Sequence, residues 1–208
     1  MDTKIVKTNQ EDALLLSREM LRNGSLIAFP TDTVYGLAAD PFNISAIIKL
    51  FEAKGRDYNK AIAILVGSIE QVKLITDSFT ENAEKLTRQF WPGGLTVIVP
   101  KRKDVPDLLS GNQTIGIRMP DHPFTLELLK QFGPLATTSA NLSGGPNPQN
   151  AADVLVQLNN RIPLILDGGE CPGGVPSTVV DCTTNEVYVL RAGAVSEEKI
   201  QLCLTKNY

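Results

Sequence analysis

Residues 29–56 constrain the fold of this 208-residue chain more than any other stretch. They begin at the end of a short apolar run, residues 26–29, which is typical of a buried strand and is stopped by a proline. A loop dense in hydroxyl groups follows, and a helical segment then ends on Lys54-Gly55-Arg56. Hydroxyls can orient a small polar ligand, and a lysine beside an arginine suits phosphate. The stretch therefore predicts a polar site where a strand ends.

Helical and strand patterns intermix along the rest of the chain, with few clean β–α–β repeats. The last two strands form a hairpin-like pair, residues 61–66 indicate a strand covered on both faces, and residues 101–113 indicate a surface connection. Strands are expected at residues 4–7 (an edge strand), 25–29, 61–66, 95–99, 114–118, 134–139, 163–166, 177–182 and 187–190. Helices are expected at residues 10–22, from Asn43 or Ser45 to 54, and at 69–76, 80–90, 124–132, 151–159 and 196–204. These patterns predict one α/β domain, residues 1–208, with a mixed sheet.

Composition excludes several classes of protein. The net charge of −3 argues against nucleic acid as an obligate ligand, although a local basic cleft stays possible. Three cysteines without metal spacing indicate reduced thiols rather than a disulfide framework. The first 20 residues lack the apolar core of a secretory signal, and no apolar run reaches the about 20 residues of a membrane span. We therefore expect a soluble, cytoplasmic protein with no membrane partner.

Six sequence blocks together closely resemble the YrdC/TsaC family of threonylcarbamoyl-AMP synthases. They are PTDTVYGLAADPFN with FEAKGR at 30–56, WPGGLT at 91–96, IGIRMPDHP at 115–123, TTSANLSGGPNP at 137–148, PSTVVD at 176–181 and LRAGAV at 190–195. The resemblance implies a twisted open mixed sheet with flanking helices and a concave active-site face. Because the chain stops soon after LRAGAV, it resembles the short, single-domain form of the family.

The family reaction joins L-threonine, bicarbonate or CO₂, and ATP into threonylcarbamoyl-AMP, and it releases pyrophosphate. The resemblance thus implies these three substrates, with Mg²⁺ carried in by ATP. The product serves the threonylcarbamoyladenosine modification at position 37 of tRNA. Possible partners are therefore tRNA and threonylcarbamoyl-transferase proteins.

Family positions carry over to this sequence residue by residue. The resemblance implies four catalytic residues: Lys54, Arg56, Ser139 and Asn141. It implies ATP contacts at Arg56, Lys60, Ser139, Asn147 and Arg191, and threonine contacts at Thr33, Leu65, Arg118, Thr137 and Ser177, with Thr31 a neighbour. The chain departs from the family pattern at residues 57–62, where members often have a proline after the arginine and a Pro-Leu pair further on.

Each motif also has a purely structural interpretation. Lys54 and Arg56 could complement the dipole at a helix C-terminus, and the run from Ser139 to Gly145 could be an ordinary polar turn. The main functional alternative is a YrdC-like nucleotide- or RNA-binding protein without synthase activity. Convergence of Lys54, Arg56, Ser139 and Asn141 in one pocket would favour the synthase.

Other catalytic and binding classes have little support in the sequence. His122 is the only histidine, which nearly excludes a catalytic triad or a histidine-rich metal site, and we expect it to be structural. Four isolated aspartates give a weak magnesium signal, so no protein metal site is predicted: Asp32, Asp40, Asp167 and Asp181. Neither a P-loop nor a strand-linked GxGxxG occurs.

Overall fold

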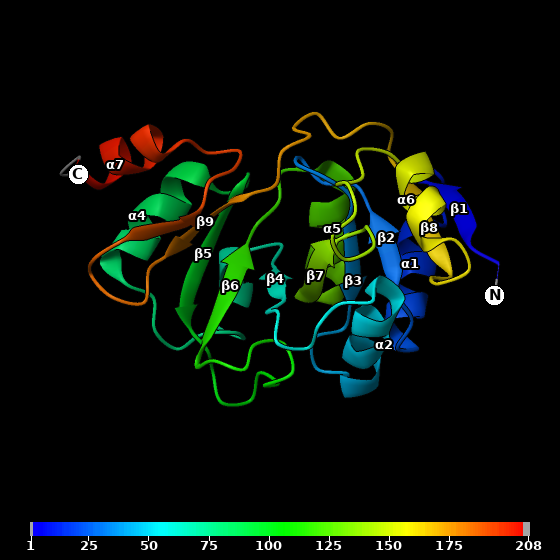
Figure 1. Ribbon diagram of the computed structural model, residues 1–208, viewed down its shortest axis with the longest axis horizontal. Coiled ribbons are helices and arrows are strands. Elements are labelled where there is room, and N and C mark those ends of the chain that lie inside the picture. Colours follow the sequence, from blue (N-terminus) through cyan, green and yellow to red (C-terminus); the bar gives the residue numbers. More distant parts are fainter. Residues whose placement is uncertain (1, 206–208) are drawn as a thin grey trace.

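The computed structural model describes residues 2–205 and is built on one ten-stranded sheet (Figure 1). The strands are β1 (Lys4–Lys7), β2 (Ile27–Phe29), β3 (Gly36–Ala39), β4 (Ala63–Leu65), β5 (Leu95–Pro100), β6 (Thr114–Arg118), β7 (Leu135–Ser139), β8 (Leu164–Asp167), β9 (Thr178–Asp181) and β10 (Tyr188–Arg191). The helices are α1 (Ala13–Arg22), α2 (Ile44–Lys54), α3 (Ile69–Val72), α4 (Glu81–Phe90), α5 (Pro123–Phe132), α6 (Ala151–Leu158) and α7 (Glu197–Thr205).

The sheet mixes parallel and antiparallel pairs, as the sequence predicts. Its order is β1-β8-β2-β3-β7-β4-β6-β5-β9-β10. Parallel pairs such as β4 with β6 alternate irregularly with antiparallel pairs such as β5 with β6. The edge position of β1 and the hairpin of β9 with β10 are confirmed.

Helices bury apolar residues on both faces of the sheet. Successive strand residues point to opposite faces, so Ile27 and Phe29 enter one core while Ala28 enters the other. The core around Ile27 lies against α1 and α5, whereas the larger core includes residues of α2, α6, α4 and α7. In Figure 1, α4 and α7 cover one end of the molecule and α1, α2, α5 and α6 cover the other. None of the helices in the described part of the chain is long and apolar enough to cross a membrane.

Strand β3 corrects the prediction of a continuous loop after Phe29. It pairs antiparallel with both β2 and β7. A run of four small or apolar residues carries no alternation, so only the neighbouring strands reveal it as a strand. Gly36 is required there because a Cβ atom would lie 2.9 Å from the Thr137 methyl group.

The segment 101–113 is also more than the predicted surface connection. Val105 and Leu109 are fully buried, and the Leu109 carbonyl accepts a 2.7 Å hydrogen bond from the Ile62 N–H. The connection therefore pins the start of β4 to the core. The burial of Val105 and Leu109 was not predicted because most of the surrounding residues are charged, polar or glycine.

The boundaries of α2 place the first candidate cations. Of the two predicted caps, Asn43 and Ser45, Asn43 is the one that caps the helix, and its side chain accepts from the Ala46 N–H at 3.1 Å. Gly55 ends it in the left-handed conformation, with φ 59°. Lys54 is consequently the last helical residue, and Arg56 leaves the helix in a new direction.

Candidate active site

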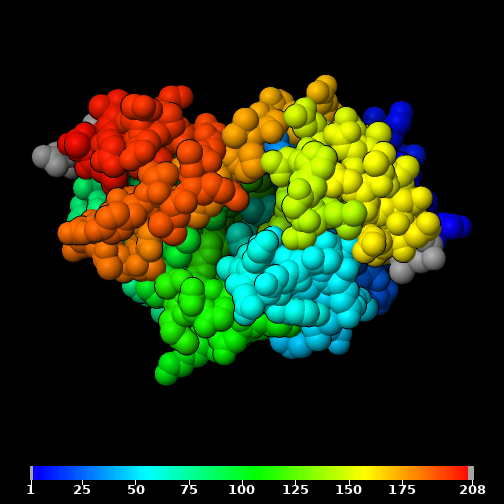
Figure 2. Space-filling model, in the orientation of Figure 1, coloured from blue at the N-terminus to red at the C-terminus, as the bar shows by residue number. Residues whose placement is uncertain are grey.

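A cavity of about 300 Å³ lies on the concave face of the sheet. In Figure 2 it is the hollow between the green and orange segments and the cyan and yellow-green segments. Residues two apart on neighbouring strands point into it, because side chains of one parity share a face. These pairs are Ala63 and Leu65, Thr96 and Ile98, Gly116 and Arg118, Thr137 and Ser139, and Ser177 and Val179.

Arg118, at the end of β6, is held rigidly at one side of the cavity. The residue is only 7% exposed. The guanidinium donates to the Gly93 carbonyl at 3.0 Å, to Thr33 Oγ1 at 2.9 Å and to Asp32 Oδ1 at 2.5 Å. Burial lowers the pKa of Arg118, whereas the ion pair with Asp32 opposes that shift. Each terminal nitrogen retains one N–H, so Arg118 can still bind an anion.

The direction of the Thr31 hydroxyl hydrogen beside Arg118 is fixed. Thr31 donates its only hydroxyl hydrogen to the Val34 carbonyl at 2.7 Å. Thr31 Oγ1 also accepts from the N–H groups of Thr33 at 3.1 Å and Val34 at 3.3 Å, and it lies 3.0 Å from Thr33 Oγ1, where Thr31 has no hydrogen left to donate. Thr33 Oγ1 also accepts from Arg118, so one of its lone pairs stays available to a ligand.

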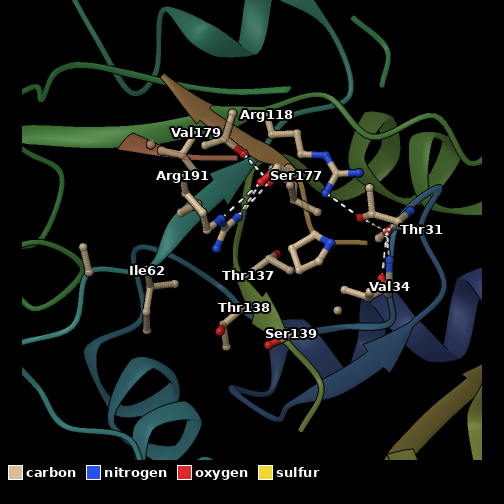
Figure 3. A pocket seen from close by; sticks show the side chains of 18 of the residues that line it. Thr31, Val34, Ile62, Arg118, Thr137, Thr138, Ser139, Ser177, Val179 and Arg191 are labelled. Atoms are coloured by element: carbon tan, nitrogen blue, oxygen red, sulfur yellow. Dashed lines mark hydrogen bonds between the residues drawn. The ribbon is translucent and has the colours of Figure 1, made fainter. Parts of the chain in front are cut away.

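Arg191 and Ser177 form a second polar group on the same cavity. The Arg191 guanidinium donates to the Ser177 carbonyl at 2.8 Å and 3.2 Å and to Ser177 Oγ at 3.2 Å. Ser177 Oγ lies 2.8 Å from Thr96 Oγ1. Figure 3 shows Arg118 and Arg191 entering one cavity from the side opposite Thr137, Thr138 and Ser139. Burial lowers the pKa of Arg191.

Arg56 lines the cavity through an extended side chain that backbone oxygens hold in place. Nη2 donates to the Ala61 carbonyl at 2.8 Å, and Nε donates to the Lys60 carbonyl at 3.4 Å. Burial lowers the pKa of Arg56. Within residues 2–205, neither Arg56 nor Arg191 forms an ion pair with a carboxylate. The cavity therefore carries positive charge that an anionic ligand could neutralise.

Lys54 and Asn141 lie behind the cavity wall. Lys54 is 2% exposed, and its ammonium donates to the carbonyls of Ser139 and Asn141 and to Asn141 Oδ1. Burial and the nearby charge of Arg56 lower the pKa of Lys54 to about 7. Ser139 lines the cavity, and its hydroxyl donates to Asn141 Oδ1 at 2.5 Å.

The predicted site residues thus fall into three groups. Lys54 and Asn141 contact Ser139 from behind and do not line the cavity, and Lys60 is exposed next to the lining residue Ala61. The predicted residues that line the cavity are Thr31, Thr33, Arg56, Leu65, Arg118, Thr137, Ser139, Asn147, Ser177 and Arg191.

Several lining residues escaped the sequence analysis. Thr96, Gly116 and Val179 belong to the quoted motifs but received no role there. Their signal in the sequence is side-chain alternation, because each lies two residues from another lining residue: Ile98, Arg118 and Ser177. Gly116 leaves room at the cavity floor, where a Cβ atom would meet the Thr96 methyl group at 3.1 Å.

Titratable groups outside the cavity form no second centre. In the described range 2–205, no three His, Cys, Asp or Glu side chains are grouped to hold a metal ion. His122 precedes α5 without capping it, and burial lowers its pKa. The three cysteines are buried and none of them forms a disulfide within residues 2–205.

Comparison with known proteins identifies the family. The Sua5_yciO_yrdC family model, described as Telomere recombination, matches residues 19–193. The chain belongs to the Sua5/YciO/YrdC family.

Relatives within the Sua5/YciO/YrdC family share one printed name. Threonylcarbamoyl-AMP synthase of Bacillus subtilis (strain 168) is 42% identical over 185 residues, which are 88% of this chain and 54% of the relative. The Pyrococcus abyssi enzyme of that name is 39% identical over 92% of this chain and 57% of its own length. The Vibrio cholerae enzyme is 36% identical over 84% of this chain and 94% of its own length. The chain therefore spans a little over half of the first two relatives.

A solved Sua5/YciO/YrdC structure shares the fold closely. P. abyssi Sua5 complexed with L-threonine superposes with a TM-score of 0.94 at 38% identity, covering 98% of this chain and 61% of that chain. Escherichia coli YciO gives a TM-score of 0.85 at 24% identity, which shows the fold alone. The predicted α/β class with an open mixed sheet is confirmed.

Proposed function

We propose that this chain is a threonylcarbamoyl-AMP synthase and that the cavity is its active site. Bicarbonate takes up a proton and loses water to give CO₂, and the amine of L-threonine adds to CO₂ to form the carbamate with loss of a proton. A carbamate oxygen then attacks the α-phosphorus of ATP as the bond to pyrophosphate breaks. The products are threonylcarbamoyl-AMP and pyrophosphate.

One observation carries the proposal: three arginines of one cavity stand beside hydroxyls of fixed direction. Arg56 and Arg191 have no carboxylate partner among the residues that the structure describes, so their charge is available to phosphate oxygens. Arg118 keeps two N–H groups for a carboxylate. The names of the relatives, and L-threonine in the Pyrococcus complex, support the same substrates.

The Arg118 side of the cavity suits an amino acid. A carboxylate would bind the two remaining Arg118 N–H groups, and Thr33 Oγ1 would accept a hydrogen from the amine or hydroxyl of threonine. Leu65 and Thr137 would then contact the aliphatic part of the substrate. Ser177, tied to Arg191, would lie between the amino acid and the nucleotide.

This chemistry needs positioning and charge more than a proton shuttle. A deprotonated amine is a nucleophile and CO₂ is an electrophile, so no side chain has to activate either. The adenylation step needs alignment and neutralisation of phosphate charge, which oriented arginines provide. We assign Arg56, Asn147 and Arg191 to the nucleotide, with Lys60 able to reach it from the rim.

The wider setting is part of the same proposal. Mg²⁺ would enter bound to the phosphates of ATP, a common mode for this ion. The adenylate would pass to a threonylcarbamoyl-transferase for modification of tRNA at position 37 in the cytoplasm.

Product identification tests the proposal. The protein is incubated with ATP, L-threonine and ¹³C-bicarbonate, and the nucleotides are separated by liquid chromatography with mass spectrometry. We expect a threonylcarbamoyl-AMP species that carries the ¹³C label and disappears without threonine. Nucleotide binding without any such species would favour the binding protein that lacks synthase activity.

A further inference from the structure

Lys54 has no hydrogen left for a ligand. An alkylammonium carries three N–H groups. All three have acceptors in the protein: the Ser139 carbonyl, the Asn141 carbonyl at 2.5 Å and Asn141 Oδ1 at 3.1 Å. The ammonium is buried and does not line the cavity.

The same contacts fix the orientation of the Asn141 amide. Lysine only donates, so the atom facing Lys54 must be the oxygen. A backbone carbonyl only accepts, so the atom 2.7 Å from the Gly145 oxygen must be the nitrogen. Asn141 Oδ1 then accepts from both Lys54 and Ser139, which occupies its two lone pairs.

Ser139 is consequently an acceptor toward the cavity. Its single hydroxyl hydrogen points to Asn141 Oδ1, so only oxygen lone pairs face a ligand. Phosphate oxygens are also acceptors and cannot bind this hydroxyl. A ribose hydroxyl or the exocyclic amine of adenine can donate to it.

The backbone reinforces the arrangement. The Ser143 N–H donates to the Lys54 carbonyl at 2.9 Å, so the end of α2 and residues 139–145 are joined through side chain and main chain. Arg56, two residues beyond Lys54, lines the same cavity as Ser139. Lys54 therefore connects the two segments that bring Arg56 and Ser139 to the ligand.

We propose that Lys54 and Asn141 are positioning residues that touch no substrate and hold Ser139 as a hydrogen-bond acceptor for the nucleoside part of the nucleotide. The inference rests on the proposed function in that ATP is the ligand. It differs from the expectation that all four family residues contact the reacting groups.

Calorimetric titration tests this assignment with ATP, AMP and adenosine. The proteins are the wild type, Lys54→Met, Ser139→Ala and the double variant. Ser139→Ala should weaken binding of all three ligands by about threefold to tenfold, the net value of one hydrogen bond. Lys54→Met should weaken adenosine binding at least as much, and the double variant should bind adenosine no more weakly than Lys54→Met.

A direct phosphate contact by Lys54 gives a different pattern. Lys54→Met would then weaken ATP and AMP but leave adenosine unchanged, and its effect would multiply with that of Ser139→Ala. That result overturns the proposal. Lys49→Met is the matched control, because Lys49 lies on α2, is exposed and donates to the Gly24 carbonyl far from the cavity.

The remaining outcomes distinguish failure of the positioning claim from failure of the proposed function. If circular dichroism shows that Lys54→Met does not fold, Asn141→Leu replaces it in the same double-mutant cycle of wild type, two single variants and the double variant. If the losses of adenosine binding caused by Asn141→Leu and Ser139→Ala then multiply in the double variant, the inference is overturned. If the wild type binds none of the three ligands, the proposed function fails and the inference fails with it. If the wild type binds ATP and the cycle is multiplicative, only the positioning claim fails.

Discussion

At the residue scale, the role of each positively charged side chain in the site depends on the groups that contact its charge. Arg118 has a carboxylate partner, Lys54 has only neutral oxygens, and Arg56 has two backbone carbonyls. We assign the three cations separate roles. Arg118 binds the amino acid, Lys54 positions Ser139 in the cavity wall, and Arg56 neutralises phosphate charge. Each role predicts a different response to substitution.

Arg56→Ala should abolish most turnover and leave the fold intact. Its guanidinium is expected to neutralise phosphate charge, and loss of one such interaction commonly lowers kcat by on the order of a hundredfold or more. Stability should change by about 1 kcal/mol, because the side chain is half-buried and donates only to backbone oxygens. Steady-state pyrophosphate release and urea unfolding measure the two effects. Arg88→Ala, on the exposed face of α4, is the control.

Asp32→Asn should destabilise the protein and weaken threonine binding. Removal of one partner from a largely buried ion pair costs about 3 kcal/mol, because the other charge stays buried. Arg118 would also lose the contact that fixes its guanidinium. Asp40→Asn is a matched control, since Asp40 Oδ1 accepts only the Phe42 N–H in a turn. Equal unfolding free energies for the two variants would contradict the role of the ion pair.

Because burial lowers the pKa of Lys54, the free energy of unfolding should change with pH in a definite direction. Its pKa is lowered to about 7 in the folded protein from an ordinary 10.5. Between these values the unfolded chain binds more protons, so stability rises with pH by up to about 1.4 kcal/mol per unit. Below pH 7 the cost of burying the charge is constant.

The unfolding free energy of the wild type minus that of Lys54→Met isolates this effect. Other groups titrate alike in both proteins and cancel. We expect the difference to become more positive from pH 7 to pH 10. A flat difference would show that the Lys54 ammonium is not destabilised by burial.

At the scale of elements, the end of α2 determines where the cations lie. Gly55 adopts φ 59° with no atom near a prospective Cβ, so only the backbone conformation opposes a side chain there. Gly55→Ala should therefore cost about 1 kcal/mol. Gly111→Ala is the control, because Gly111 has equally open space without a left-handed backbone. Thermal unfolding of both variants measures the difference.

The elements also show how far sequence reasoning reaches. Helix α2 was predictable because Asn43 and Gly55 mark its ends, β5 because of its apolar run, and β6 because its two isoleucines alternate with other residues. Strand β3 was not, since four small residues become a strand only between β2 and β7. Ser139 and Arg56 were found through motifs, whereas the place of Lys54 behind the wall depends on contacts 85 and 87 residues away.

At the scale of the whole molecule, a chain of net charge −3 concentrates unpaired positive charge in one hollow. The hollow lies near the middle of the sheet, where β7, β4, β6, β5 and β9 contribute side chains of one face. Residues 168–176 cross from β8 to β9 above it and bring in Pro176 and Ser177 (Figure 1). Distant parts of the chain thus complete a single cavity, which is the basis for placing threonine and ATP together.

Pyrophosphate release from ATP is the most direct test of that central claim. It is measured with threonine, bicarbonate and both substrates omitted in turn, for the wild type and Arg56→Ala. We predict release that requires both substrates and is lost in the variant. Release that persists without threonine or bicarbonate, or is absent with all substrates present, would contradict the assignment of this cavity to threonylcarbamoyl-AMP synthesis.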